Sequence, residues 1–280
     1  MLKQIEGSQA VADVVALCRP NVIAAYPITP QTHIVEDLAL IVGQGKLDAE
    51  FVNVESEFSA ASVVLGASAA GARTYTATSS QGLLLMAEVI YCIAGMRLPI
   101  VLTCANRAIS APLSIWNDQQ DSMAVRDAGW IQLFAEDNQE AADLHIQAYK
   151  IAEQTFLPVM VCMDGFILTH AFEPVDIPEQ KEVDDFLPPF KPRHIVDPRW
   201  PRGIGLYADP RFYMETRYIL HRAMEKSEKT IKEVSADFAK TFGRDSGGFI
   251  KTYKLKEADV AIVSMGSVVG TIKDLIDQLE

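Results

Sequence analysis

The chain has 280 residues, of which 49% are hydrophobic and 22% are charged. This length and balance fit a globular protein with a sizeable core and exclude a disordered chain. It has 25 Lys and Arg against 37 Asp and Glu, giving a formal net charge of -12. Such an excess of negative charge argues against a nucleic acid or an anionic membrane as the partner.

Two stretches of the sequence contain enough apolar residues to raise the question of a targeting signal or a membrane span. The N-terminal segment carries Glu6 and Asp13 where a secretory signal needs an uninterrupted apolar core, so we expect a cytoplasmic protein. The most hydrophobic window, residues 82–105, is interrupted by Arg97 and Pro99, among others. These interruptions favour a buried helix, a turn and a buried strand over a membrane span.

The four cysteines show no metal-binding or disulfide pattern. They form no CxxC pair and have apolar neighbours in the sequence, which is typical of buried, reduced thiols. We therefore expect that this chain alone holds no iron-sulfur cluster. The four are Cys18, Cys92, Cys104 and Cys162.

Runs of strand-forming residues alternate with helical segments along most of the chain. The strand candidates are residues 21–28, 73–80, 99–105 and 158–165, and the helix candidates are 31–42, 57–71, 81–95 and 138–154. Alternation of this kind is typical of a parallel sheet with helices on both faces. The sequence therefore predicts an α/β fold.

The C-terminal third has a different texture. Residues 172–210 are rich in proline and charge, which predicts a long ordered arm along the surface. A long helix is expected over 211–243, ended by Gly243. The last segment is typical of a strand, a glycine turn and a helix, too little to bury a core of its own. Its GSVVG sequence lacks the third glycine of a dinucleotide fingerprint and is weak evidence for nucleotide binding.

Three polar features each follow a predicted strand. They are Thr29 in the turn YPITP, the acids Glu55 and Glu57 in ESE, and Arg107 in NRA. Because ligands gather at the carboxyl ends of parallel strands, these residues are candidates for one site. Pro27 restricts the backbone around Thr29, and an arginine at a strand end can hold a carboxylate through paired hydrogen bonds.

Each candidate also has a simpler explanation. A glutamate before a helix rich in Ala, Ser and Gly can serve only as a helix cap that interacts with the dipole. A loop arginine can be plain surface charge. Residues 114–123 are rich in polar groups and can lie at a site entrance or form an ordinary surface loop.

Taken together, these motifs resemble the thiamine diphosphate-dependent 2-oxoacid:ferredoxin oxidoreductases, most closely the alpha subunits of the multi-subunit pyruvate:ferredoxin oxidoreductases. The matching stretches include AYPITPQTHIVEDLA, LDAEFVNVESEFSA, GASAAGARTYTATSSQGLLLMAEV and LPVMVCMDGFILTH, together with the segment that begins GMRLPIVLTCANRAIS. They occur in order over essentially the whole chain. Other thiamine enzymes, of the transketolase or acetolactate type, lack the YPITP turn followed by NRA.

The resemblance implies a pyrimidine-binding domain of the thiamine diphosphate fold over residues 1–253. Residues 254–280 would begin a transketolase C-terminal-like domain that continues in the family's alpha subunits. Glu57 would contact N1′ of the aminopyrimidine and assist its proton transfer, with Glu55 the weaker candidate. Pro27, Ile28 and Thr29 would line the cofactor, and Thr29 and Arg107 would lie beside the oxoacid, whose carboxylate Arg107 would hold.

The resemblance also implies partners and an activity. The thiamine diphosphate would be shared with a beta subunit that carries the diphosphate and magnesium, and iron-sulfur clusters would lie on partner chains that include gamma and ferredoxin-like delta subunits. The implied reaction converts pyruvate and coenzyme A to acetyl-CoA and carbon dioxide, reversibly, with electrons passing to ferredoxin. Alternatives are a subunit for 2-oxoisovalerate or another oxoacid, and a truncated partner chain without turnover.

Overall fold

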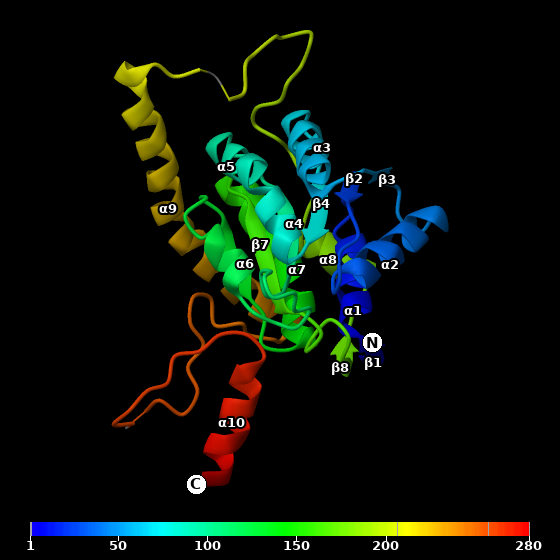
Figure 1. Cartoon of the computed structure of the whole chain (residues 1–280), viewed down its shortest axis with the longest axis vertical. Helices are drawn as coiled ribbons and strands as arrows, with labels where there is room; N and C mark the ends of the chain where they lie inside the picture. Colours follow the sequence, from blue (N-terminus) through cyan, green and yellow to red (C-terminus); the bar gives the residue numbers. More distant parts are fainter. Residues whose placement is uncertain (1, 206, 257, 280) are drawn as a thin grey trace.

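Six strands form one parallel sheet in the order β3-β2-β4-β5-β7-β6, and two more form a small antiparallel pair, β1-β8 (Figure 1). The computed structural model describes residues 2–205, 207–256 and 258–279. The strands are β1 (Leu2–Glu6), β2 (Val22–Ala25), β3 (Glu50–Asn53), β4 (Thr74–Thr78), β5 (Val101–Asn106), β6 (Ile131–Phe134), β7 (Val159–Asp164) and β8 (Phe172–Asp176). The helices are α1 (Gly7–Leu17), α2 (Thr32–Gly43), α3 (Glu57–Ala69), α4 (Ser80–Leu85), α5 (Ala87–Gly95), α6 (Gln120–Ala124), α7 (Asn138–Thr155), α8 (Gln180–Phe186), α9 (Pro210–Phe242) and α10 (Val268–Leu279).

The sheet separates two apolar cores. Alternate residues of a strand point to opposite faces, so in β5 Val101 joins one core and Leu102 the other. The first core is packed by α1, α2 and α7, with α8 and α9 outside them, and the second by α3, α4 and α5. The central strands β4, β5 and β7 are buried along their whole length, as expected for a sheet covered on both faces.

The predicted α/β fold is confirmed. All four predicted strands form, and the predicted helices over 31–42, 57–71 and 138–154 form with ends that differ by at most two residues. The helix predicted over 81–95 is two helices that meet at Met86. Asp137 caps α7 by accepting a hydrogen bond of 2.7 Å from the Glu140 amide.

The prediction of a long surface arm over residues 172–210 is partly wrong. Its first residues form β8, which pairs with β1, and then α8, because these two short elements cover the end of α1. Residues 187–209 form neither helix nor strand apart from one isolated bridge, among the residues described there. The long helix is confirmed as α9, and Gly243 ends it at a φ of 74°, the left-handed conformation that favours glycine.

The strand predicted in the final segment does not form in its described residues, 258–265. A single strand with no neighbour to pair with gains no ladder hydrogen bonds, and Val260 and Val263 are exposed instead. The helix that was predicted to follow is α10. Ser267, just before α10, donates hydrogen bonds from its amide and hydroxyl to Asp164 at 2.8 and 2.6 Å.

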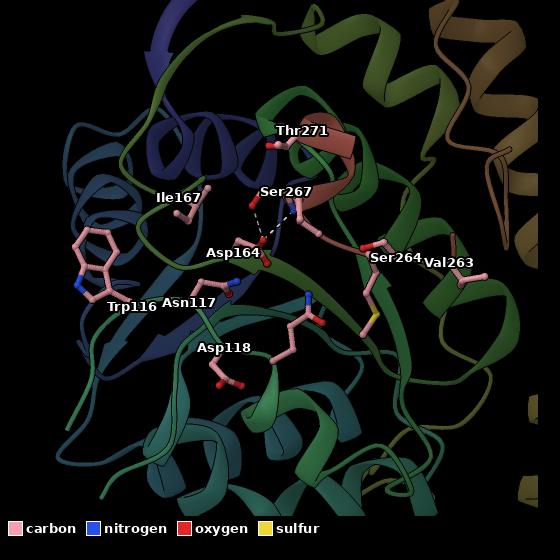
Figure 2. A pocket seen from close by; sticks show the side chains of 12 residues that line it. Trp116, Asn117, Asp118, Asp164, Ile167, Val263, Ser264, Ser267 and Thr271 are labelled. Carbon is pink, nitrogen blue, oxygen red and sulfur yellow. Dashed lines mark hydrogen bonds between the residues drawn. The ribbon is translucent and has the colours of Figure 1, made fainter. Parts of the chain in front are cut away.

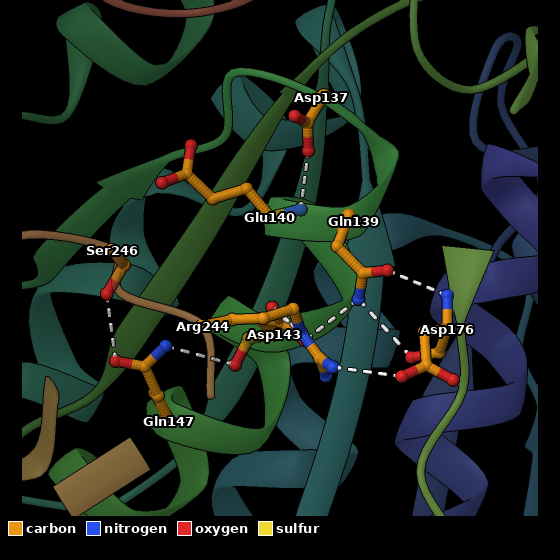
Figure 3. Close-up of polar contacts among 8 residues, drawn as sticks. All are labelled: Asp137, Gln139, Glu140, Asp143, Gln147, Asp176, Arg244 and Ser246. Atoms are coloured by element: carbon orange, nitrogen blue, oxygen red, sulfur yellow. Dashed lines mark hydrogen bonds and ion pairs between the residues drawn. The ribbon is translucent and has the colours of Figure 1, made fainter. Parts of the chain in front are cut away.

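A network of charged groups fastens the end of α9 to the main sheet domain (Figure 3). Arg244 holds Asp143 of α7 through two parallel hydrogen bonds of 2.7 and 2.8 Å, and it reaches Asp176 of β8 at 3.2 Å. Ser246 continues the network by donating to Gln147. Because a planar guanidinium matches a carboxylate in this geometry, the contact fixes the direction of the chain after α9.

Three of the four cysteines are buried free thiols, as predicted, but Cys92 is exposed. It lies on the outer side of α5, where the helix turns its other face to the core. None of the helices in the described part of the chain combines the length and apolar character needed to cross a bilayer.

Candidate active site

The strand order creates a switch point between β2 and β4. From β2 the chain moves outward to β3, and it then returns to the other side of β2 as β4. Loops that leave the carboxyl ends of two such strands diverge and leave a crevice, which is where open α/β sheets bind ligands. Thr29 follows β2, Ser79 follows β4 and Arg107 follows β5, so the chain delivers polar groups to this edge.

Arg107 contacts one of the other predicted residues, Thr29, and also Gln81, which the sequence does not single out. Its Nη1 donates a hydrogen bond of 2.7 Å to the carbonyl of Thr29, and its Nη2 donates one of 2.7 Å to Oε1 of Gln81. Arg107 is 7% exposed, and burial lowers the pKa of its guanidinium. The reading of Arg107 as a solvated loop residue is therefore wrong.

The turn at Thr29 is fixed by a side chain that the sequence does not single out. Gln31 is buried, and its Oε1 accepts from the Ile28 amide at 3.2 Å while its Nε2 donates to the Ala77 carbonyl of β4 at 2.7 Å. Pro27 and Thr29 are exposed and Ile28 is partly buried. The turn thus presents its surface at the crevice while Gln31 anchors it to the sheet.

Asp121 is the buried centre of the site and is also not predicted, because it lies far along the loop after β5. Its Oδ2 accepts from the amides of Ser80 and Arg107 at 2.9 and 3.0 Å, and its Oδ1 accepts from Nδ2 of Asn106 at 2.8 Å. Burial raises the pKa of this carboxyl, although its hydrogen bonds oppose the shift. The carboxylate holds the turns after β4 and β5 together.

Ser80 carries backbone strain at this junction. Its φ of 47° lies in the left-handed region, which is uncommon for a residue with a side chain. The Asp121 carboxylate accepts its amide, and its hydroxyl donates to the Ala108 carbonyl at 2.6 Å. These bonds turn the chain sharply from β4 into α4 and place Gln81 and Gly82 at the crevice.

Glu57 begins α3 and is 8% exposed. The cap of this helix is Ser56, whose hydroxyl accepts from the Ser59 amide at 3.2 Å, so capping does not require Glu57. The Glu57 carboxylate has no hydrogen-bond partner among the residues that the structure describes. A Cβ placed on Gly82 would lie 2.6 Å from its Oε1, so only a glycine leaves room for this carboxylate.

Glu55 differs from Glu57 in its exposure and in its hydrogen bonding. Its side chain is exposed, and the Ser59 hydroxyl donates to it, a hydrogen bond that lowers the pKa of the Glu55 carboxyl. The structure therefore separates the two acids, with Glu57 facing inward and Glu55 facing solvent. The described residues leave the hydrogen-bonding capacity of the Glu57 carboxylate unused, which points to a ligand for Glu57.

Several other buried polar atoms at this edge lack partners among the described residues. They are Oγ1 of Thr78, Oγ of Ser79, Oδ1 of Asn106 and Nε of Arg107. A Cβ on Gly82 would lie 2.4 Å from the Thr78 hydroxyl as well, so this hydroxyl lies beside the Glu57 carboxylate. Unpaired buried polar atoms in native proteins call for an explanation, and their concentration at one edge marks this edge as a candidate functional site.

A cavity of about 960 Å³ opens next to this edge (Figure 2). It is lined on one side by Asn117 and Asp118 of the loop after β5, and on the other by residues 263–268 before and at the start of α10. Figure 2 shows Ser267 turned toward Asp164 at the floor between them. Residues 114–123 therefore contribute both a cavity wall and Asp121.

The model of the family described as pyruvate flavodoxin/ferredoxin oxidoreductase, thiamine diphosphate binding, matches residues 13–236. The chain belongs to this family. Pyruvate synthase subunit PorA of Methanosarcina barkeri is 54% identical over 98% of this chain and 69% of its own length, and that of Methanothermobacter thermautotrophicus is 52% identical over 100% and 73%. Ketoisovalerate oxidoreductase subunit VorA of Pyrococcus horikoshii is 45% identical over 99% and 71%.

A solved relative shares the fold. The 2-oxoglutarate:ferredoxin oxidoreductase from Magnetococcus marinus superposes with a TM-score of 0.76 at 21% sequence identity, over 99% of this chain. This chain spans about half, 51%, of that longer chain. The residues that the family model matches include Thr29, Glu57 and Arg107, and the unused hydrogen-bonding capacity of the Glu57 carboxylate fits a polar cofactor.

Proposed function

We propose that this chain is the alpha subunit of a pyruvate synthase, a pyruvate:ferredoxin oxidoreductase that uses thiamine diphosphate. The greater identity to pyruvate synthase subunits, 52–54%, than to ketoisovalerate oxidoreductase subunits, 45%, supports pyruvate over a branched oxoacid. The observation that carries the proposal is the carboxylate of the largely buried Glu57, which lies beside Thr78 and Gly82 and has no hydrogen-bond partner among the described residues.

In this proposal Glu57 holds N1′ of the aminopyrimidine and exchanges a proton with it. When bound, thiamine diphosphate supplies the electron sink that lets an oxoacid lose carbon dioxide. The exposed face of the turn at Pro27, Ile28 and Thr29 lines the cofactor. The Nη hydrogens of the Arg107 guanidinium that Thr29 and Gln81 leave unused hold the oxoacid carboxylate.

We further propose a partner arrangement and a domain division. A beta subunit would carry the diphosphate and magnesium, and gamma and ferredoxin-like delta subunits would complete the complex. Iron-sulfur clusters would lie on partner chains, and coenzyme A would accept the acyl group. Residues 254–280 would begin a second domain, and 1–253 would be the pyrimidine-binding domain. A cytoplasmic location stays a prediction. A partner chain without turnover remains the alternative function, and the experiment below decides between the two.

The test is a reconstituted complex. We expect the chain, combined with beta, gamma and delta subunits, thiamine diphosphate, magnesium and coenzyme A, to reduce a viologen dye with pyruvate faster than with 2-oxoisovalerate or 2-oxoglutarate. Glu57→Gln should reduce kcat by about 100- to 10,000-fold, as expected when an acid-base group is removed. Glu55→Gln is the matched control and should change kcat little.

Three results would contradict the proposal. Equal losses in the two variants would mean that Glu57 is not the acid at N1′. Faster reduction with a branched oxoacid would assign the alternative substrate. Absence of reduction by the wild-type chain, with partners that are active with another alpha subunit, would favour the chain without turnover.

A further inference from the structure

Three possible metal ligands that are not among the residues assigned to the crevice meet where the start of α1, the start of α2 and the turn after β7 come together. Glu6, His33 and His170 each offer one ligand atom, and these atoms all lie within 4.8 Å of one another. We propose that the three side chains bind one Zn²⁺ ion. This site is independent of the proposed activity, since none of its members contributes to the crevice.

Glu6 and His170 are brought together by the backbone. The Gly7 amide donates to the Ala171 carbonyl at 3.0 Å, and the Ser8 amide donates to the Thr169 carbonyl at 3.0 Å. A Cβ placed on Gly7 would lie 2.1 Å from the carbonyl oxygen of Leu168, so the two segments approach as closely as only glycine permits. Two ligands therefore stand on backbone that is fixed by direct hydrogen bonds.

His33 completes the cluster from the first turn of α2. Its Nδ1 lies 2.7 Å from Oε1 of Glu6, and its ring centroid lies 4.8 Å from that of His170. A hydrogen bond between His33 and Glu6 explains that pair by itself, but it does not explain why a second imidazole is directed to the same place. Two imidazoles packed against one carboxylate are a common ligand set for Zn²⁺.

The ring of His170 is oriented by its neighbours. Its Nδ1 lies 2.7 Å from the Thr169 hydroxyl, which in turn accepts the Phe166 amide at 2.8 Å. The Phe166 ring stacks on the imidazole with centroids 4.4 Å apart. These contacts occupy Nδ1 and leave Nε2 as the ring nitrogen available to a metal, the arrangement in which a supporting hydrogen bond orients a metal-binding histidine.

The chemistry of the three ligands selects the metal. Imidazole nitrogen suits zinc and its neighbours in the transition series, whereas magnesium and calcium prefer oxygen ligands. Three protein ligands leave a fourth tetrahedral position for water. Glu36 and Asp37 of α2 also act electrostatically on His33, so the surroundings are acidic and favour a cation.

Equilibrium dialysis of the untagged, chelator-treated chain against ZnCl₂, together with the visible spectrum of the Co²⁺ form, tests the site. We expect one ion per chain, an intense spectrum typical of four-coordinate cobalt, and at least a tenfold weaker affinity in His33→Gln, His170→Gln and Glu6→Gln. The control is His221→Gln, which removes an exposed histidine whose Nε2 lies 3.6 Å from Oε1 of Glu225 on α9 and which has no second imidazole beside it.

Wild-type affinity in all three ligand variants would overturn the proposal, as would the absence of stoichiometric binding. Retained affinity in His170→Gln alone would also overturn it, because the His33 and Glu6 pair would then be a plain surface contact. Far-UV circular dichroism identifies any variant that fails to fold, and the other two ligand variants still decide the question. Loss of pyruvate-dependent activity plays no part in the test, so the two proposals stand or fall separately.

Discussion

Arg107 donates a hydrogen bond of 2.7 Å from Nη1 to the backbone carbonyl of Thr29, so the ends of two strands that are not adjacent in the sheet meet through one guanidinium. Arg107→Lys keeps the charge but loses the planar fork. In the reconstituted complex we expect the KM for pyruvate to rise by about 10- to 100-fold, the size expected for lost hydrogen bonds to a charged group. Arg126→Lys, at an exposed position, is the control, and an unchanged KM in Arg107→Lys would show that another residue binds the carboxylate.

The substitution Gly82→Ala tests whether the position of the Glu57 carboxylate matters for activity. A Cβ at this position would lie 2.6 Å from Oε1 of Glu57 and 2.4 Å from Oγ1 of Thr78, so Gly82→Ala must displace the carboxylate. Alanine is otherwise the better helix former, so the chain should stay folded. We expect kcat to fall by about tenfold or more, since positioning of a proton-transfer group is lost rather than the group itself. The melting temperature should also fall, because the added methyl group crowds the buried Thr78 side chain.

The control for this prediction is Gly66→Ala in α3. A Cβ there meets nothing within 4 Å, so the substitution should leave kcat unchanged and stabilise the chain by up to about 1 kcal/mol. If Gly82→Ala keeps the wild-type kcat, the Glu57 carboxylate either has another place to go or is not used. Dye reduction and thermal unfolding measure the two effects separately.

Residues that directly follow strongly apolar strands could be predicted from the sequence, because the strand pattern alone carries them to the sheet edge. Thr29 and Arg107 are of this kind, and they touch. Asp121 could not be predicted, since it reaches the same edge through a long loop whose path depends on tertiary hydrogen bonds. Gln31 likewise looks like an ordinary first-turn residue until its partner Ala77 on β4 is known.

Dependence on contacts between distant parts of the chain also explains the elements that the sequence did not predict. The edge strands β3 and β6 mix polar with apolar residues and are only partly buried, so neither forms the apolar run that marks the equally short β2. The strands β1 and β8 form because they pair with each other across most of the chain, which no local pattern records. Conversely, the apolar residues near position 260 have strand character, but residues 258–265 pair with no strand in the part of the chain that the structure describes.

The substitution Arg244→Ala tests how much the contacts at the end of α9 contribute to stability. The carboxylate of Asp143 is 7% exposed and receives two hydrogen bonds from Arg244. Arg244→Ala leaves this buried carboxylate without its cation, and we expect the free energy of unfolding to fall by about 1–3 kcal/mol. Urea denaturation measures this. Arg199→Ala, which breaks an exposed pair with Asp197, should leave the free energy of unfolding nearly unchanged, and an equal loss in both variants would refute the distinction.

The burial of His145 should make the stability of the fold depend on pH. The ring is fully buried, with Nδ1 donating to the Ala141 carbonyl at 2.6 Å and Nε2 2.6 Å from the Thr103 hydroxyl, which the Tyr75 hydroxyl also contacts. Since Nδ1 carries the proton, Nε2 accepts from Thr103 and the imidazole is neutral. Burial lowers the pKa of His145 from 6.5 to about 4, because the charged ring cannot be hydrated there.

Whether acid stabilises or destabilises the fold depends on how many protons His145 binds in the folded and in the unfolded chain. Between pH 4 and pH 6.5 the unfolded chain holds a proton on His145 that the folded chain does not, so stability falls as the pH is lowered through this window. The contribution is fully present above pH 6.5, and about 3 kcal/mol is lost by pH 4. Urea denaturation from pH 7 to pH 4 should therefore show a smaller decrease for His145→Gln, although this variant is less stable at pH 7. His221→Gln, which removes an exposed histidine, should follow the wild-type curve, and a His145→Gln curve parallel to wild type would mean that the folded protein accepts the proton.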